Sequence, residues 1–223
     1  MIVFKKNIFD FALLLSSLLM LIGTNPIQAE THPTFDCRKA TTEVEKAICA
    51  HTDLAYFDAR MEQIWKILLT AFDDDGMKAR LRQDQAAWLT VRNNCKENSA
   101  CIGDAYRNRL SQLGFEGKQS RFSGQYEAKN IGDITLYPTA DPTYLLAIHT
   151  ADPEQGAWTC VAFGTATGKD STLSVTVGDD SFVIKQTDAG TLLIDANDQV
   201  LAVAQKYCGL NGGFSFTYHR LPL

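Results

Sequence analysis

Six cysteines are the residues of this chain with the most obvious capacity for chemistry. The first two stand in the segment FDCRKATTEVEKAIC, residues 35–49, with eleven residues between them. Cysteines at this spacing could ligate a metal, form a redox pair or form a disulfide. The chain has no CxxC pair and its histidines are scattered, which argues against a metal site. The six residues are Cys37, Cys49, Cys95, Cys101, Cys160 and Cys208.

Residues 1–29 have the pattern of a secretory signal peptide. Lys5 and Lys6 supply the positive charge, an apolar run follows, and Ala29 supplies the small residue of a cleavage site. The apolar run is short for a membrane span, and no cysteine follows Gly23 as a lipoprotein signal requires. We therefore expect a periplasmic or secreted protein without a membrane span, whose even number of cysteines forms disulfides in an oxidising compartment.

Charge and motifs limit the functional classes. The formal net charge is −5 at pH 7, from 21 basic and 26 acidic residues. Nucleic acid is not expected as a partner, because phosphate binding requires a basic surface. A cationic protein fits better, since opposite net charges speed encounter. The chain lacks a Gly-framed serine elbow, a Walker-type loop and an HExxH motif, so we predict a binding protein with no catalytic residues and no cofactor.

Acidic and glycine-rich stretches could contact such a partner. DDDG, residues 73–76, lacks the alternating spacing of a calcium loop. We interpret it either as a solvated turn or as an acidic segment that attracts a cationic partner. GLNGG, residues 209–213, is either a turn between strands or a loop that enters a cleft. Glu43 and Glu45 are interpreted as capping and helix-dipole charges, not as a catalytic pair. The residues proposed for partner contact are Asp73, Asp74, Asp75 and Asn211.

The first half of the predicted mature chain has helical periodicity. Thr42 and Glu45 form a capping box ahead of a short helix, and apolar residues at three- and four-residue steps continue the pattern beyond it. Gly114 ends the last helix. The four predicted helices cover about residues 43–49, 54–72, 77–94 and 99–113.

Beyond about residue 118 the period of the pattern changes to two. Eight short stretches alternate or run apolar, with turn residues between them and hardly room for a helix. The predicted strands are residues 122–128, 133–138, 143–149, 158–164, 171–177, 181–186, 191–196 and 214–220. Short connections favour an antiparallel meander that closes, or nearly closes, into a barrel. The predicted class is α+β, with a disulfide-tied helical domain over 30–117 and a barrel-like domain over 118–223.

Proximity in the sequence favours one pairing of the cysteines. Nearest-neighbour pairing joins Cys37 to Cys49 and Cys95 to Cys101, and it leaves the two cysteines of the β half as a third pair. Such bridges matter in a small bundle, whose own core supplies little stability. Six cysteines allow fifteen connectivities, and a bridge from Cys37 or Cys49 to one of the next two cysteines remains open.

Four segments together indicate a family. FDCRKATTEVEKAIC, LAYFDARM, LRQDQAAWLTVRNNC and CIGDAYRNRLSQL resemble, in order and spacing, the domain named after the lysozyme inhibitor LprI, over about residues 35–113. The resemblance implies a helical, disulfide-tied, exported bacterial domain that inhibits lysozyme. The residues that match the family motif are Asp58, Gln85, Trp88, Arg92, Tyr106 and Arg109.

These motif residues allow two interpretations. Gln85, Trp88 and Arg92 are spaced by three and four residues, so one helical face could present all three to a partner. The structural interpretation, which we favour, places Trp88 in the core and pairs Arg92 with a carboxylate such as Asp58. The motif then specifies the fold and not a recognition patch.

The β half resembles only loosely the small eight-stranded barrels of MliC-type lysozyme inhibitors, and it offers no residue-by-residue match to their inhibitory loop. We expect a protein that occludes the cleft of a cationic cell-wall hydrolase such as c-type lysozyme. The alternative is an envelope interaction, assembly or immunity-type module that does not bind lysozyme. Recovery of an endogenous envelope partner in place of added lysozyme would favour the alternative.

Overall fold

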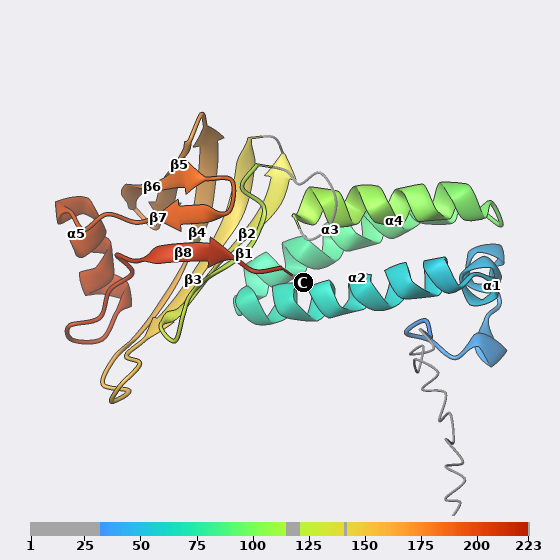
Figure 1. Cartoon of the computed structure of the whole chain (residues 1–223), viewed down its shortest axis with the longest axis horizontal. Coiled ribbons are helices and arrows are strands. Elements are labelled where there is room, and N and C mark those ends of the chain that lie inside the picture. Colours follow the sequence, from blue (N-terminus) through green and yellow to red (C-terminus); the bar gives the residue numbers. More distant parts are fainter. Residues whose placement is uncertain (1–31, 115–120, 141, 223) are drawn as a thin grey trace, which may run out of the picture. The chain divides into compact units, whose positions relative to one another are not determined.

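The structure, a computed structural model, describes residues 32–114, 121–140 and 142–222. These residues fall in one compact unit of α+β class, in which helices precede an antiparallel β-barrel (Figure 1). The predicted signal peptide, residues 1–29, and the predicted domain boundary between residues 117 and 118 lie outside the described residues.

Four α-helices and one short 3-10 helix form the first part of the described chain. Their bounds are Cys37–Lys39 for η1, Glu43–Ala50 for α1, Thr52–Ala71 for α2, Asp75–Asn93 for α3 and Ser99–Leu113 for α4. The four predicted helices are confirmed, but α2 and α3 begin two residues earlier than predicted. Their first turns are polar, and an apolar stripe does not mark polar residues. Gly114 ends α4 in the left-handed conformation, as glycine commonly does after a helix.

The capping box at the start of α1 is complete. The Thr42 hydroxyl accepts a hydrogen bond from the Glu45 N–H, and the Glu45 carboxylate accepts one from the Thr42 N–H at 3.0 Å. We expect Thr42→Ala to lower the free energy of unfolding by about 1 kcal/mol, because it leaves an end group of the helix unpaired. Urea denaturation would measure this loss, with the exposed Thr70→Ala in α2 as a control expected within about 0.5 kcal/mol of the parent. Equal losses for the two variants would contradict the prediction.

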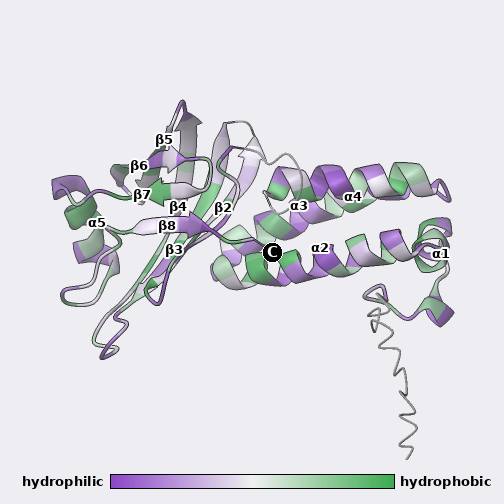
Figure 2. Cartoon of the chain, in the orientation of Figure 1, coloured by the Kyte–Doolittle hydropathy of each residue, from purple (hydrophilic) through white to green (hydrophobic). Residues whose placement is uncertain are grey.

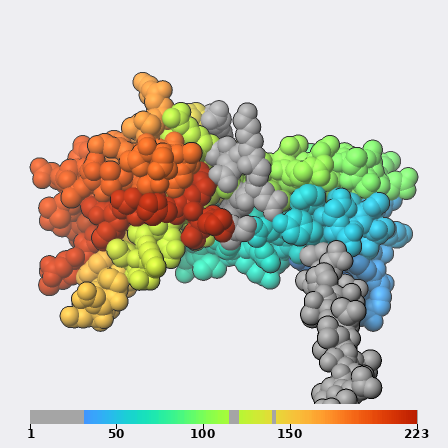
Figure 3. Space-filling model, in the orientation of Figure 1, coloured from blue at the N-terminus to red at the C-terminus, as the bar shows by residue number. Residues whose placement is uncertain are grey.

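Eight antiparallel strands form a closed barrel in sequence order, with β8 paired to β1. The strands are β1 Gly124–Ala128, β2 Gly132–Ala140, β3 Thr143–Ala151, β4 Thr159–Lys169, β5 Thr172–Val177, β6 Asp180–Asp188, β7 Thr191–Leu193 and β8 Thr217–Arg220. All eight predicted strands are confirmed. Figure 3 shows the last strand, in red, between the orange strands before it and the yellow-green β1, as the closed order requires.

One helix of the second part was not predicted. α5, Asp198–Tyr207, lies between β7 and β8, so the expectation of hardly any room for a helix there was wrong. Its buried residues Val200, Val203 and Ala204 follow the helical spacing of three and four, and Asn197 caps its first turn. The signal was therefore present, but a ten-residue helix between two strand-like stretches is easily counted as part of a turn.

β3 contributes apolar side chains both to the barrel core and to the core of the helices. Its central residues are buried on both faces of the strand, which fits the unbroken apolar run TYLLAIH. Leu146 and Ile148 pack in the barrel core, whereas Leu145 and Ala147 pack in the core of the helices. Tyr137 of β2 joins this second core, and its ring contacts Phe72 at the end of α2. The apolar core of the helices therefore includes side chains from the outer face of the barrel. Figure 2 shows apolar and polar residues alternating along the helices.

Three disulfides connect all six cysteines. Cys37 is bridged to Cys49 and Cys95 to Cys101, which ties the lead-in to the end of α1 and closes the turn between α3 and α4. The third bridge joins β4 to the end of α5. The structure therefore has the nearest-neighbour pairing, and the cross-pairings that the sequence left open do not occur.

Candidate functional site

Asp58 is the centre of a buried polar cluster within the helices. Its Oδ2 accepts hydrogen bonds from the Thr34 N–H at 2.9 Å and the Thr34 hydroxyl at 2.7 Å. Its Oδ1 accepts one from the Tyr106 hydroxyl at 2.7 Å. Burial raises the pKa of the Tyr106 phenol well above its usual value, so this group stays a hydrogen-bond donor. Asp58 therefore ties α2 to α4 and to the segment before η1.

Arg92 supplies the positive charge of the same cluster. Its Nη1 donates to the Tyr106 hydroxyl at 2.7 Å and lies 3.9 Å from Asp58 Oδ1. The guanidinium also lies over the rings of Trp88 and Tyr106, at 5.6 and 5.5 Å from their centroids. Trp88 is partly buried against the helical core. This arrangement is the one that the structural interpretation describes, with Arg92 facing the Asp58 carboxylate from α3.

Arg109 forms a second polar cluster where α4 meets the barrel. Its side chain is 3% exposed, and its Nη2 donates to Asp84 Oδ2 at 3.0 Å and to the Tyr137 hydroxyl at 2.8 Å. Tyr137 in turn donates to Asp84. Gln85 belongs to this cluster, 3.5 Å from Arg109 Nη2, and not to the one around Asp58. The six motif residues thus divide into two clusters that join helices to each other and to β2.

Sequence reasoning missed three members of these clusters, namely Thr34, Asp84 and Tyr137. Asp84 precedes Trp88 by four residues and so lies on the same side of α3, which was an available signal. Tyr137 lies within the mixed strand GDITLYPTA, and nothing in that pattern distinguishes it. Most polar groups of both clusters are paired within them, which favours a structural role, although Arg109 Nε is buried without a hydrogen-bond partner.

The acidic turn at residues 73–76 has structural roles of its own. Asp74 caps α3 by accepting a hydrogen bond from the Met77 N–H at 2.9 Å. Asp73 pairs with Lys78, and this hydrogen bond lowers the pKa of the Asp73 carboxyl. Asp75 is the first residue of α3, where a negative charge complements the helix dipole. All three carboxylates are nonetheless exposed at the surface.

Glu43 and Glu45 both lie in the first turn of α1. Hydrogen bonds from the Thr42 and Thr41 N–H groups to Oε2 lower the pKa of the Glu45 carboxyl, which caps the start of α1. The geometry corresponds to the capping interpretation of these residues.

The loop of residues 209–213 is fixed to the barrel at its base. The bridge between Cys160 and Cys208 precedes it, and the Gly209 N–H donates to the Thr159 carbonyl at 2.9 Å. The Thr150 hydroxyl donates to the Gly213 carbonyl at 2.8 Å at the other end of the loop. These contacts hold both ends of a short segment on neighbouring strands β3 and β4.

The tip of this loop projects an apolar side chain. Leu210 is 87% exposed, and Asn211 has a left-handed backbone with φ of 66°, which asparagine tolerates better than most residues. Leu201 of α5 is also exposed, at 55%, and lies with Leu210 and Asn211 along a hollow of about 420 Å³. Leu210 is thus available for contact with a partner, and only Asn211 of this surface was named from the sequence.

The described residues hold neither a candidate metal-binding cluster nor a candidate membrane-spanning helix. In the ranges 32–114, 121–140 and 142–222, no group of three or more histidine, cysteine or acidic side chains could hold a metal ion. Within those same ranges, no helix is both long and apolar enough to cross a membrane.

Fold and polar clusters define a class of α+β protein in which a disulfide-tied helical bundle is completed by an eight-stranded barrel. Residues 37–126, which hold the helices and the start of the barrel, match the family model described as lysozyme inhibitor LprI. The match ends within β1, and the rest of the barrel lies outside it. No curated protein and no solved structure matches the chain.

Proposed function

We propose that this chain is an exported bacterial binding protein that inhibits lysozyme or another cell-wall hydrolase. The observation that carries the proposal is the match of residues 37–126 to a family described as lysozyme inhibitors. The three disulfides fit an oxidising compartment such as the periplasm or the cell exterior. We propose binding without catalysis or a cofactor, because the buried polar groups of the helices pair mainly with each other.

The loop of residues 209–213 is the proposed cleft-occluding element. Leu210 is the most exposed large apolar side chain among the described residues, and the base of its loop is fixed by a disulfide and by hydrogen bonds. A segment that is already ordered loses little conformational entropy on binding, so its contacts contribute more fully to affinity. Asn211 would present its amide beside Leu210 for a polar contact at the cleft wall.

The acidic turn at residues 73–76 has a different part in the proposal. Its exposed carboxylates and the net charge of −5 would attract a cationic enzyme such as c-type lysozyme. Their effect lies in the rate of association, which should fall as salt rises because salt screens exposed charges. Asp73→Asn with Asp75→Asn tests this part, while Asp74 is left in place because it caps α3.

The first test is the lysis rate of a peptidoglycan suspension by c-type lysozyme, with and without residues 30–223 as one chain. We expect protection near stoichiometric amounts. Leu210→Asp should weaken inhibition at least tenfold, because it places a charge at the centre of an apolar contact. Val183→Asp is the matched control, since Val183 is exposed to 41% on β6 and lies outside the loop.

Two outcomes would contradict the proposal at different levels. Absence of protection, with the three disulfides verified by peptide mapping, would remove inhibition of c-type lysozyme and favour an envelope interaction or immunity-type module. A pull-down from an envelope extract would then identify the endogenous partner. If Leu210→Asp and Val183→Asp protect the suspension equally well, the protein is still an inhibitor, but its contact surface lies outside the loop of residues 209–213.

A further inference from the structure

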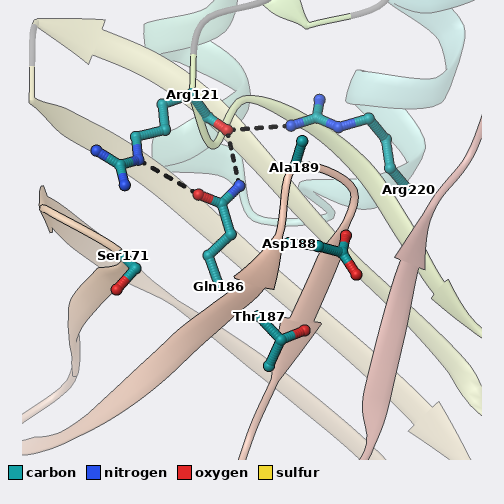
Figure 4. Close-up of a pocket in the computed structure, with 7 residues that line it drawn as sticks. All are labelled: Arg121, Ser171, Gln186, Thr187, Asp188, Ala189 and Arg220. Atoms are coloured by element: carbon teal, nitrogen blue, oxygen red, sulfur yellow. Dashed lines mark hydrogen bonds between the residues drawn. The ribbon is translucent and has the colours of Figure 1, made fainter.

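A second hollow, of about 520 Å³, lies where the β4–β5 turn, the β6–β7 turn, β8 and the segment before β1 meet (Figure 4). We call it the arginine hollow. Figure 4 shows Arg121 reaching over Gln186, with Ser171 on one side and Thr187 and Asp188 on the other. Its lining residues are Arg121, Ser171, Gln186, Thr187, Asp188, Ala189 and Arg220.

Arg121 is held in a defined orientation. Its Nε donates to the Gln186 side-chain oxygen at 3.3 Å, and the Gln186 amide donates back to the Arg121 carbonyl at 3.3 Å. Its guanidinium also lies 5.5 Å from the ring centroid of Phe122. No described residue forms a hydrogen bond with its two terminal nitrogens, which are the paired donors that match a carboxylate.

Arg220 adds a second positive charge that only neutral groups contact. It donates to the carbonyls of Gly114 at 3.3 Å and Arg121 at 3.2 Å, to the Ser123 carbonyl and to the Tyr126 hydroxyl. Its Nε is buried without a hydrogen-bond partner. A partly buried cation whose direct contacts are all neutral keeps an outward positive potential, since no contacting carboxylate neutralises it.

One carboxylate shares the hollow but is engaged elsewhere. Asp188 Oδ1 accepts a hydrogen bond from the Gly190 N–H at 2.8 Å in its own turn. Among the residues that the structure describes, neither Arg121 nor Arg220 has a carboxylate oxygen within 4.0 Å. The hollow is therefore locally positive on a chain of net charge −5.

We propose that the arginine hollow binds the carboxylate of an acidic saccharide. The paired terminal nitrogens of Arg121 would take the carboxylate, with the potential of Arg220 behind them. The exposed hydroxyls of Ser171 and Thr187 are suited to sugar hydroxyls. A volume of about 520 Å³ is within the usual range for small-ligand sites.

The test is a titration of residues 30–223 with N-acetylmuramic acid, followed by amide chemical shifts. N-acetylglucosamine, which lacks the carboxylate, serves as the neutral probe, and inorganic phosphate reports whether any oxyanion suffices. We expect shifts at Ser171, Thr187 and Gln186 with the acidic sugar, and about tenfold weaker binding in Arg121→Gln. Lys129→Gln, which removes one exposed charge from the β1–β2 turn, should bind like the parent.

Four results would overturn the proposal. They are equal binding of the acidic and neutral sugars, equal binding by Arg121→Gln and the parent, absence of shifts at any soluble concentration, and tighter binding of phosphate than of the acidic sugar. The lysis assay of the same variants is a separate readout, because Arg121→Gln should not change inhibition through the loop of residues 209–213. Failure of one proposal is thus distinguishable from failure of the other.

Discussion

Asp58→Ala is expected to lower the free energy of unfolding by about 3 to 5 kcal/mol. The substitution leaves the Arg92 guanidinium, 12% exposed in its side chain, without the carboxylate that faces it at 3.9 Å. It also removes the acceptor for the Tyr106 hydroxyl and for both donors of Thr34. A buried charge that loses its partner costs more than the pair itself contributes, because the remaining group stays desolvated.

Urea denaturation followed by circular dichroism measures this loss. Glu62→Ala is the matched control on the same helix, because Glu62 forms an exposed pair with Lys66 at 3.5 Å. Such a surface pair contributes less than about 1 kcal/mol. A loss below about 1 kcal/mol for Asp58→Ala would show that water or neighbouring groups replace the carboxylate, and the scaffold role of this motif residue would be wrong.

Replacing both Cys160 and Cys208 by alanine is expected to cost about 4 kcal/mol of unfolding free energy in the chain-entropy model. The bridge spans 48 residues, so its removal restores much freedom to the unfolded chain. It also holds the base of the loop of residues 209–213. Under the proposed function we therefore expect inhibition to weaken at least tenfold, even at temperatures where the variant remains folded.

The bridge between Cys95 and Cys101 provides the comparison. It spans six residues, for which the same model gives about 2 kcal/mol, and it lies at the turn between α3 and α4. Its double alanine variant should lose less stability and should retain the inhibition that we propose for the loop of residues 209–213. If the two double variants lose equal stability, loop-closure entropy does not account for the contribution of these bridges.

Local sequence patterns predicted most secondary-structure elements of this protein. Helical periodicity identified α1 to α4, and the capping box at Thr42 placed the first of them, because these signals act within a few residues of chain. Alternation and turn residues likewise identified all eight strands. α5 was missed because its helical spacing extends over only ten residues between strand-like stretches.

The candidate site was less predictable. Asn211 was selected from its turn composition, but the exposure of Leu210 depends on how α5 and β8 leave the chain between them. The arginine hollow joins residues from positions 121 to 220, and no local pattern connects them. Their proximity results from closure of the barrel, which pairs β8 with β1.

The sequence by itself determined the helical and strand segments, the motif residues that match the LprI family, and an even set of cysteines. Only the tertiary structure decided that Gln85 and Arg109 join Asp84 and Tyr137 at the barrel, apart from the cluster around Asp58. It also decided that Leu145 and Ala147 complete the core of the helices. The physical reason is that periodicity reports which face of an element is apolar, whereas the partner of that face is set by packing between distant segments.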